Sequence, residues 1–321
     1  MLNRRILRIK VFKVIYSYSE NPTMTLKEAL SQLDLSCEAT RDLYLFMLGI
    51  ISPLTSEAKR SIEALKGKFN PTEEEKNPNM KFANNKLAPF FNSDPDFRKL
   101  LSRKKLSWEQ YDALITNLYL SIKSKDYYNA YMSSPTSSLA EDAKLFIRIF
   151  EEEFVDNEAL YTIMEDMSLY WNEDLGYSLT YCCRSLQEIA KGKAWNLPPL
   201  YKSDMLKEKD PLVESDKAFA VKLMKCAFSG YENYFGMIAE AVPQWDKDRL
   251  FATDLAIIAT GLAEARNFSE IPIKVTINEY VEISKYYSTP KSHTFVNGLL
   301  DRLIQKMASD GLINKEGKGL L

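Results

Sequence analysis

Residues 271–303, IPIKVTINEYVEISKYYSTPKSHTFVNGLLDRL, decide the fold that the sequence predicts. Thr276 and Glu279 have the spacing of a capping box, in which each side chain bonds the other residue's backbone, so a helix is expected there. Pro290 suits the first turn of a final helix. One apolar stripe at helical spacing then lines that helix, formed by Phe295, Leu299, Leu303 and Met307.

Two other segments predict helices. Residues 248–265, DRLFATDLAIIATGLAEA, are apolar on nearly every face, which is typical of a helix buried at the centre of a bundle. Residues 2–20, LNRRILRIKVFKVIYSYSE, carry apolar side chains at helical spacing, and Asn21 with Pro22 predicts the end of that helix.

A basic arc on the first helix is the strongest local sign of chemistry. Arg4, Arg5 and Arg8 span about 100° of the helix, and Phe12 and Tyr16 lie beside them. Arginines bind phosphates through charge-assisted hydrogen bonds, and aromatic rings stack on unpaired bases. An ordinary solvated basic face would contain the same residues, so both interpretations stay open.

Composition narrows the class of protein. The chain has 11 glycines in 321 residues, too few for the repeated turns of a β-sandwich or barrel, and this favours an all-α fold. Its 42 basic and 44 acidic residues give a net charge of −2, so a nucleic-acid site must be local.

Enzyme and cofactor signatures are missing from the sequence. Four cysteines and one histidine do not supply a zinc site at workable spacing, and no glycine-rich phosphate loop or nucleophile motif occurs. We therefore expect a non-enzymatic protein without a cofactor. The absence of an 18-residue apolar run and the few cysteines predict a cytoplasmic protein with reduced thiols and no membrane partner.

The middle of the chain predicts further helices with irregular connections. Thr25 and Glu28 form a second capping-box pattern, which predicts a short helix through Leu35. Residues 41–65 are expected to form a helix that Pro53 kinks or breaks. Residues 67–96, rich in proline and asparagine, predict a long irregular connection on the surface, followed by a helix capped by Ser107.

The C-terminal segment resembles the signature of the NusB family of transcription antitermination factors. The family pattern runs P-x-K-V-x-I-N-E, then E-x-A-K-x-[FY], then S-x-x-F-V-N-G-x-L-D. The matching residues, in order, are Pro272, Lys274, Val275, Ile277, Asn278, Glu279, Glu282, Lys285, Ser292, Phe295, Val296, Asn297, Gly298, Leu300 and Asp301. The first helix resembles the family's arginine-rich opening.

The resemblance implies an all-α fold in which a NusB-like pair of helical bundles is enlarged by a helical insertion. Residues 1–20 would be the first helix that completes the core, residues 21–205 the mainly helical insertion, and residues 206–312 the rest of the core. Residues 313–321 are expected to be a frayed tail.

The resemblance also implies a function: binding of boxA-type single-stranded RNA from ribosomal RNA transcripts, together with NusE, a small-subunit ribosomal protein, in the RNA polymerase antitermination complex. The implied RNA-binding residues are Arg4, Arg5, Arg8, Tyr16, Tyr287, Lys291, Ser292, His293, Phe295 and Asn297. Arginines would hold phosphates, Tyr287 or Tyr16 would stack on a base, and Ser292 with His293 would donate hydrogen bonds. Phe295 and Asn297 fit a packing role equally well.

Partner contact is implied for the central helix, with Asp254 and Glu264 as the candidate residues. The family's A-x-Y-E-L pattern is replaced there by GLAEA, and Ile6 stands where the family has a third opening arginine. The alternative interpretation is a helical protein-interaction module without direct RNA binding.

Overall fold

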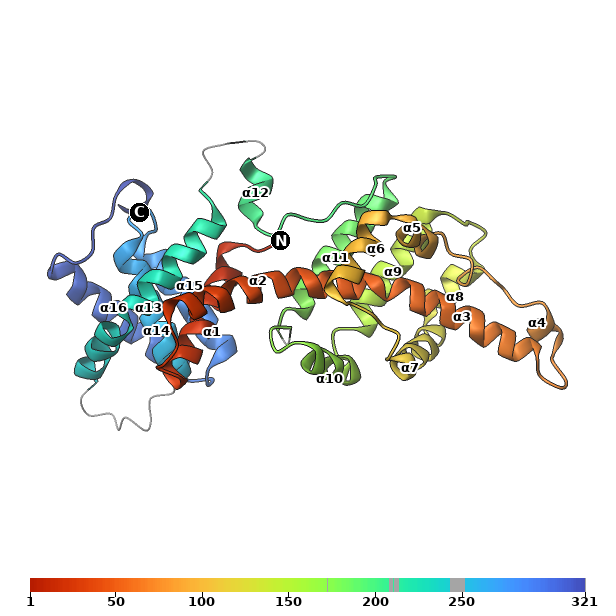
Figure 1. Ribbon diagram of the computed structural model, residues 1–321, viewed down its shortest axis with the longest axis horizontal. Coiled ribbons are helices and arrows are strands. Elements are labelled where there is room, and N and C mark those ends of the chain that lie inside the picture. The colour runs from red at the N-terminus through yellow and green to blue at the C-terminus, as the bar shows by residue number, and fades with distance from the viewer. Residues whose placement is uncertain (172, 208–209, 211–213, 243–251, 321) are drawn as a thin grey trace. The chain divides into compact units, whose positions relative to one another are not determined.

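The computed structural model describes residues 1–171, 173–207, 210, 214–242 and 252–320. These residues form α-helices, one 3-10 helix (Gly317–Leu320) and a single isolated parallel bridge between Leu2 and Tyr201, which confirms the all-α prediction (Figure 1). The chain divides into two compact units. Unit 1 combines Met1–Cys37 with Pro199–Leu321, and unit 2 is Glu38–Pro198.

Unit 1 is organised around one buried helix. Its elements are α1 (Arg4–Glu20), the first part of α2 (Leu26–Gly49), α12 (Lys202–Lys207), α13 (Asp216–Ala241), α14 (Ala252–Asn267), α15 (Ile273–Tyr287) and α16 (Ser292–Ser309). Helix α14 contacts α1, α13, α15 and α16, and every residue from Asp254 to Ala265 is buried. The predicted central helix is thus confirmed, although its residues 248–251 lie outside the described part of the chain.

Helix α1 forms where the sequence predicts it. The Asn3 side chain accepts a hydrogen bond from the Ile6 amide and caps the first turn, and the helix ends at Asn21. The apolar side chains of Leu7, Val11 and Val14 are buried, which directs the other faces of α1 outward or toward charged partners.

The predicted start of α15 is wrong. The helix begins at Ile273, directly after Pro272, so Thr276 and Glu279 lie inside it. Their side chains contact other helices instead of capping this one, as described below. Helix α16 begins at Ser292, two residues after Pro290. Its buried stripe includes Leu299, Leu303 and Met307, whereas Phe295 is only half-buried and the adjacent Val296 is fully buried.

Unit 2 contains the remaining helices. They are the second part of α2, α3 (Ile51–Lys66), α4 (Glu73–Lys76), α5 (Leu87–Ser93), α6 (Pro95–Lys104), α7 (Asp112–Lys123), α8 (Asp126–Ser133), α9 (Leu139–Glu153), α10 (Glu158–Met167) and α11 (Leu175–Ala190). Helices α9 and α11 pack against each other, and α3 packs against α5 and α7. The expected insertion over 21–205 contains all of unit 2, whereas residues 21–37 and 199–205 belong to unit 1.

The second capping box is present, but the helix that follows is longer than predicted. Thr25 and Glu28 bond each other's backbone amides, and α2 then continues past Leu35 to Gly49. The predicted interruption near Pro53 is confirmed, because α2 ends at Gly49 and α3 begins at Ile51. Pro53 lies in the first turn of α3, where its missing amide hydrogen costs no bond.

The predicted irregular connection over 67–96 is correct only in part. It contains α4 and α5 and the start of α6, and Phe82, Leu87 and Phe91 are buried. The Ser107 hydroxyl accepts a bond from the Glu109 amide, but α7 starts later, at Asp112.

The C-terminal tail contacts the connection between α14 and α15. The Lys315 ammonium donates to the Phe268 carbonyl over 2.8 Å, and the Glu316 amide donates to the Ser269 carbonyl over 3.2 Å.

Among the described residues, no helix combines the length and the apolar character that crossing a membrane requires.

Candidate nucleic-acid interface

The three arginines of α1 have carboxylate partners from unit 1. Arg4 forms ion pairs with Glu214 and Asp216, and its guanidinium lies 4.9 Å from the centre of the Phe219 ring. Two-thirds of the Arg4 side chain is covered. These contacts fasten the start of α1 to α13 and occupy a group that the sequence assigns to a phosphate.

Arg8 is buried in a charge network and is not a surface residue. Only 4% of the residue is exposed. Its Nε and Nη2 donate to the two carboxylate oxygens of Glu264 over 2.7 and 2.9 Å. The same carboxylate accepts from the Thr276 hydroxyl over 2.9 Å and from the Tyr280 hydroxyl over 3.3 Å. The expectation that Arg8 holds a phosphate is therefore corrected: Arg8 joins α1 to α14.

Arg5 is the exposed member of the arginine arc. Its Nε and Nη2 donate to the two Glu279 oxygens over 2.9 and 2.7 Å, and 53% of its side chain remains exposed. The Arg5 hydrogen bonds hold the pKa of the Glu279 carboxyl below its usual value, against a smaller opposing effect of burial. A phosphate can compete for Arg5 from solvent, since the pair lies at the surface.

An aromatic and cationic group lies where α1 meets the end of α15. The Tyr287 ring packs edge-on against Phe12, with ring centres 5.0 Å apart, and the Lys13 ammonium lies 5.0 Å from the centre of the Tyr287 ring. Phe12 is buried and cannot receive a base, whereas Tyr287 is partly exposed. The structure thus brings Tyr287 and α1 together, as the resemblance implies.

The connection between α15 and α16 is held by hydroxyl groups. The Ser292 hydroxyl is buried and donates to Asp254 Oδ2 over 2.8 Å. Ser288 and Thr289 bond the same Ser292 oxygen over 2.9 and 2.8 Å. This use of the hydroxyl corrects the expectation that Ser292 bonds RNA, and gives Ser292 the role of fixing the connection.

The remaining expected RNA-binding residues are at least partly exposed. Lys291 and Asn297 are exposed, His293 and Phe295 are half-buried, and Tyr16 is exposed on α1. Phe295 has contacts of its own, so it is not a free ring. We take the candidate RNA surface to be the exposed or partly exposed residues Arg5, Lys13, Tyr16, Tyr287, Lys291, His293 and Asn297.

Two residues were missed by the sequence interpretation. Lys13 contributes the cation beside Tyr287, and Tyr286, which precedes Tyr287 in the sequence, is 82% exposed. The sequence could have indicated Lys13, because it follows Phe12 on a helix that was expected to face RNA. Tyr286 and Tyr287 are adjacent on α15 and point to different faces of the helix, and contact with Phe12 covers part of Tyr287.

The two residues expected to bind a partner protein lie in the core. Glu264 is 0% exposed and Asp254 is 3% exposed. Glu264 bonds Arg8, and Asp254 bonds Ser292. The expectation is corrected for both, because a partner cannot reach a carboxylate that the fold has covered and bonded.

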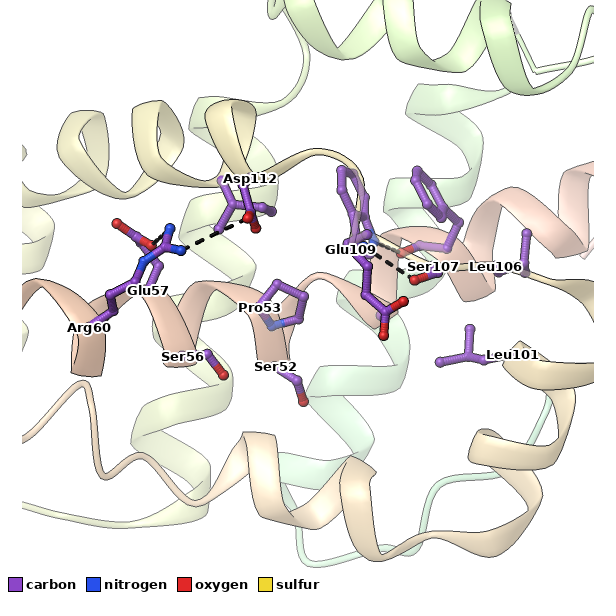
Figure 2. A pocket seen from close by; sticks show the side chains of 14 residues that line it. Ser52, Pro53, Ser56, Glu57, Arg60, Leu101, Leu106, Ser107, Glu109 and Asp112 are labelled. Carbon is purple, nitrogen blue, oxygen red and sulfur yellow. Dashed lines mark hydrogen bonds and ion pairs between the residues drawn. The ribbon is translucent and has the colours of Figure 1, made fainter.

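Unit 2 contains an open pocket of about 430 Å³ (Figure 2). Pro53 and Leu101 line its apolar side, and at one end Arg60 pairs with Glu57 and with Asp112, the latter over 3.9 Å. None of the expected site residues lines it. Within the described residues there is also no cluster of three side chains suited to holding a metal ion.

Comparison with known proteins places the similarity in unit 1 and the end of unit 2. The NusB family model matches residues 184–305. The protein named "Transcription antitermination protein NusB" from Salinibacter ruber is 34% identical over 114 residues, which cover 36% of this chain and 69% of the relative. The protein of the same name from Acetivibrio thermocellus is 32% identical, and the match covers 34% of this chain and 77% of the relative. The one from Chloroherpeton thalassium is 34% identical, and the match covers 33% of this chain and 50% of the relative. No solved structure matches.

Proposed function

Because this chain belongs to the NusB family, whose curated relatives are named transcription antitermination proteins, we propose that it binds boxA-type single-stranded RNA of ribosomal RNA transcripts together with NusE. In this role it would join the RNA polymerase antitermination complex as a non-enzymatic component. The observation that carries the proposal is the position of Tyr287, partly exposed beside Lys13 at the junction of α1 and α15.

The Tyr287 group supplies the two contacts that unpaired RNA needs. A base can stack on the exposed part of the Tyr287 ring, and the Lys13 ammonium attracts the phosphate of the same or the next nucleotide. Phe12 fixes the ring from behind, so little side-chain freedom is lost on binding. Tyr16 lies about one helical turn after Phe12 and offers a second ring for stacking.

The phosphate contacts come from a different set of cations than the sequence predicts. Arg5, Lys13 and Lys291 replace the arc of Arg4, Arg5 and Arg8, since Arg8 is buried. Three contacts on a single strand predict that the logarithm of the binding constant falls with the logarithm of salt concentration with a slope of about −2, at about 0.7 per contact.

The test is titration of labelled boxA-type RNA with the full chain and its variants. Tyr287→Ala is expected to lose about 1–3 kcal/mol of RNA affinity through the lost stacking. Tyr287→Phe retains the ring and should bind like the wild type. Tyr170→Ala, which removes an exposed tyrosine from unit 2, is the matched control. Equal binding by Tyr287→Ala and Tyr170→Ala would remove the basis of the proposal.

A second arm includes purified NusE. RNA affinity is expected to rise when NusE is present, with the salt slope retained. If RNA binding is absent at low salt both with and without NusE, while NusE itself still binds, the helical protein-interaction module is the correct interpretation. Because Asp254 and Glu264 are buried, their substitution should change stability before it changes NusE binding.

A further inference from the structure

We infer that unit 2 has its own binding site for the phosphate backbone of RNA, formed by helix α6 and the extended segment around Trp195. This inference rests on the proposed function, since it takes RNA as the ligand. The site would hold sequence outside the boxA-type element, through phosphates and not through bases.

Helix α6 and its C-cap concentrate positive charge. Residues 95–105, PDFRKLLSRKK, contain five basic residues and one acidic residue. Lys104 is used within unit 2, where it pairs with Asp42 over 3.0 Å and lies near Glu38. The other four are exposed, and no ion pair is recorded for them among the described residues: Arg98, Lys99, Arg103 and Lys105.

Charge complementarity with the helix itself does not explain this set. Basic side chains near a helix C-terminus stabilise its dipole within the last turn. Arg103, Lys104 and Lys105 meet that need at the end of α6. Arg98 and Lys99 lie outside the last turn of α6, so the helix dipole does not account for their charge.

The cations border a hollow of the right size. An open hollow of about 320 Å³ is lined by Lys99 and Arg103 on α6, and by Trp195 and Asn196 on the extended segment. Lys99 and Arg103 are four residues apart, so they share one face of α6. This volume accepts a phosphate with its attached ribose, whereas a free base would find little exposed ring, since Trp195 is buried.

The second wall of the hollow is fixed in place. The Trp195 indole donates to the Tyr44 hydroxyl over 2.9 Å, and its ring packs edge-on against Phe97 of α6 at 5.2 Å. Asn196 is exposed directly beside it and offers amide hydrogens. A fixed wall with an amide donor opposite two cations is a suitable arrangement for a phosphodiester, which has two charged-oxygen acceptors.

One carboxylate faces the same hollow, and its place sets the position of the phosphate. Asp96 lies in the first turn of α6, about 10 Å along the helix from Arg103. Asp96 is three residues from Lys99 and repels an anion at that end. The phosphate is therefore expected between Lys99 and Arg103, next to Asn196.

The experiment uses two RNAs and a matched pair of double variants of the full chain. One RNA is the boxA-type element alone, and the other extends it on both sides by about 16 nucleotides of unrelated sequence, the upper size of a single-strand site. The test variant is Lys99→Gln with Arg103→Gln. The control is Lys144→Gln with Arg148→Gln, which removes a lysine and an arginine at the same spacing from the exposed face of α9.

The wild type should bind the extended RNA more tightly than the short one. The test variant should lose about tenfold in affinity for the extended RNA, with a salt slope flatter by about 1.4, at about 0.7 for each lost phosphate contact. It should bind the short RNA like the wild type, and the control variant should behave as the wild type on both. All variants change exposed side chains, so unchanged melting temperatures are expected.

Two results would overturn the inference. One is equal affinity of the test and control variants for the extended RNA, and the other is equal wild-type affinity for the two RNAs. Failure of the wild type to bind the short RNA, with or without NusE, would instead count against the proposed function.

Discussion

At the scale of single residues, Arg8 shows how burial changes the role of a charged side chain. Its guanidinium makes two hydrogen bonds with Glu264, and Thr276 and Tyr280 complete the environment of the same carboxylate. Desolvating both ions is costly, and the pair is stable because nearly every polar atom has a partner. Arg5, three residues earlier, makes similar bonds at the surface, where solvent weakens them.

Removal of one ion from this pair should be strongly destabilising. Arg8→Met leaves Glu264 charged and buried, which is expected to lower the free energy of unfolding by about 3–5 kcal/mol in urea titrations. Arg5→Met is the surface control and should cost about 0–1 kcal/mol. Adding Glu264→Leu to Arg8→Met should recover much of the loss. Similar costs for the two single variants would mean that the Arg8 pair is solvated.

Glu279 predicts a pH dependence of stability. Its pKa is lowered in the folded protein, chiefly by the Arg5 hydrogen bonds, so the folded state binds its proton less readily than the unfolded chain. The stabilisation is then complete above the ordinary glutamate pKa and is lost as pH falls through the lowered value. Glu279→Gln should therefore flatten the fall in unfolding free energy below about pH 5. An unchanged acid slope in urea titrations at several pH values would contradict this assignment.

At the scale of elements, capping boxes show what a local pattern can decide. Thr25 and Glu28 form the reciprocal bonds that their spacing predicts, because both side chains are exposed and have no competing partner. Thr276 and Glu279 have the same spacing but lie inside α15. The Thr276 hydroxyl donates a hydrogen bond to Glu264 instead, and the Glu279 carboxylate accepts one from Arg5. Contacts from other helices therefore outweighed a local capping preference.

The connection between α15 and α16 depends on one buried hydroxyl. Ser292→Ala removes the donor to Asp254 and leaves that carboxylate buried with fewer partners, at an expected cost of about 1–3 kcal/mol. Faster hydrogen exchange of the amides over 288–293 is expected too, since Ser288 and Thr289 lose their shared acceptor. Ser309→Ala, in the exposed last turn of α16, is the control. Unchanged exchange in Ser292→Ala would show that the backbone alone holds the connection.

At the scale of the whole molecule, the chain carries its family signature on a unit assembled from both ends. Unit 1 uses residues 1–37 and 199–321, and the intervening unit 2 has a core of its own. The bridge between Leu2 and Tyr201 joins the two segments of unit 1 at the beginning of α1. The long separation in sequence therefore does not prevent a single buried core around α14.

Unit 2 should be removable without loss of the fold of unit 1. Replacement of residues 38–198 by a flexible Gly/Ser linker is expected to give a helical protein with a cooperative thermal transition. It should retain binding of the short boxA-type RNA and lose the added affinity for the extended RNA. Circular dichroism checks the helical fold and its thermal transition, and RNA titration checks the affinity for the short and the extended RNA. A folded truncation that no longer binds the short RNA would place part of the boxA site in unit 2.

The sequence by itself determined the helical class, the extent of α1 and the burial of α14. These follow from apolar spacing and from turn residues such as Asn21, which act within a few residues of themselves. The similarity of residues 271–303 to the family signature also identified Tyr287 as part of the candidate site, but the sequence did not show that Lys13 lies beside it.

Tertiary structure alone decided which charges remain at the surface. Arg8 and Glu264 are 256 residues apart, and their pairing depends on the packing of α1 against α14. Helical spacing places Arg8 on the same face as Val11, Phe12 and Ile15, but only the packing of α14 shows that a carboxylate meets it there. The hollow beside α6 likewise needs Trp195, about 90 residues later in the chain, so it exists only once unit 2 has folded.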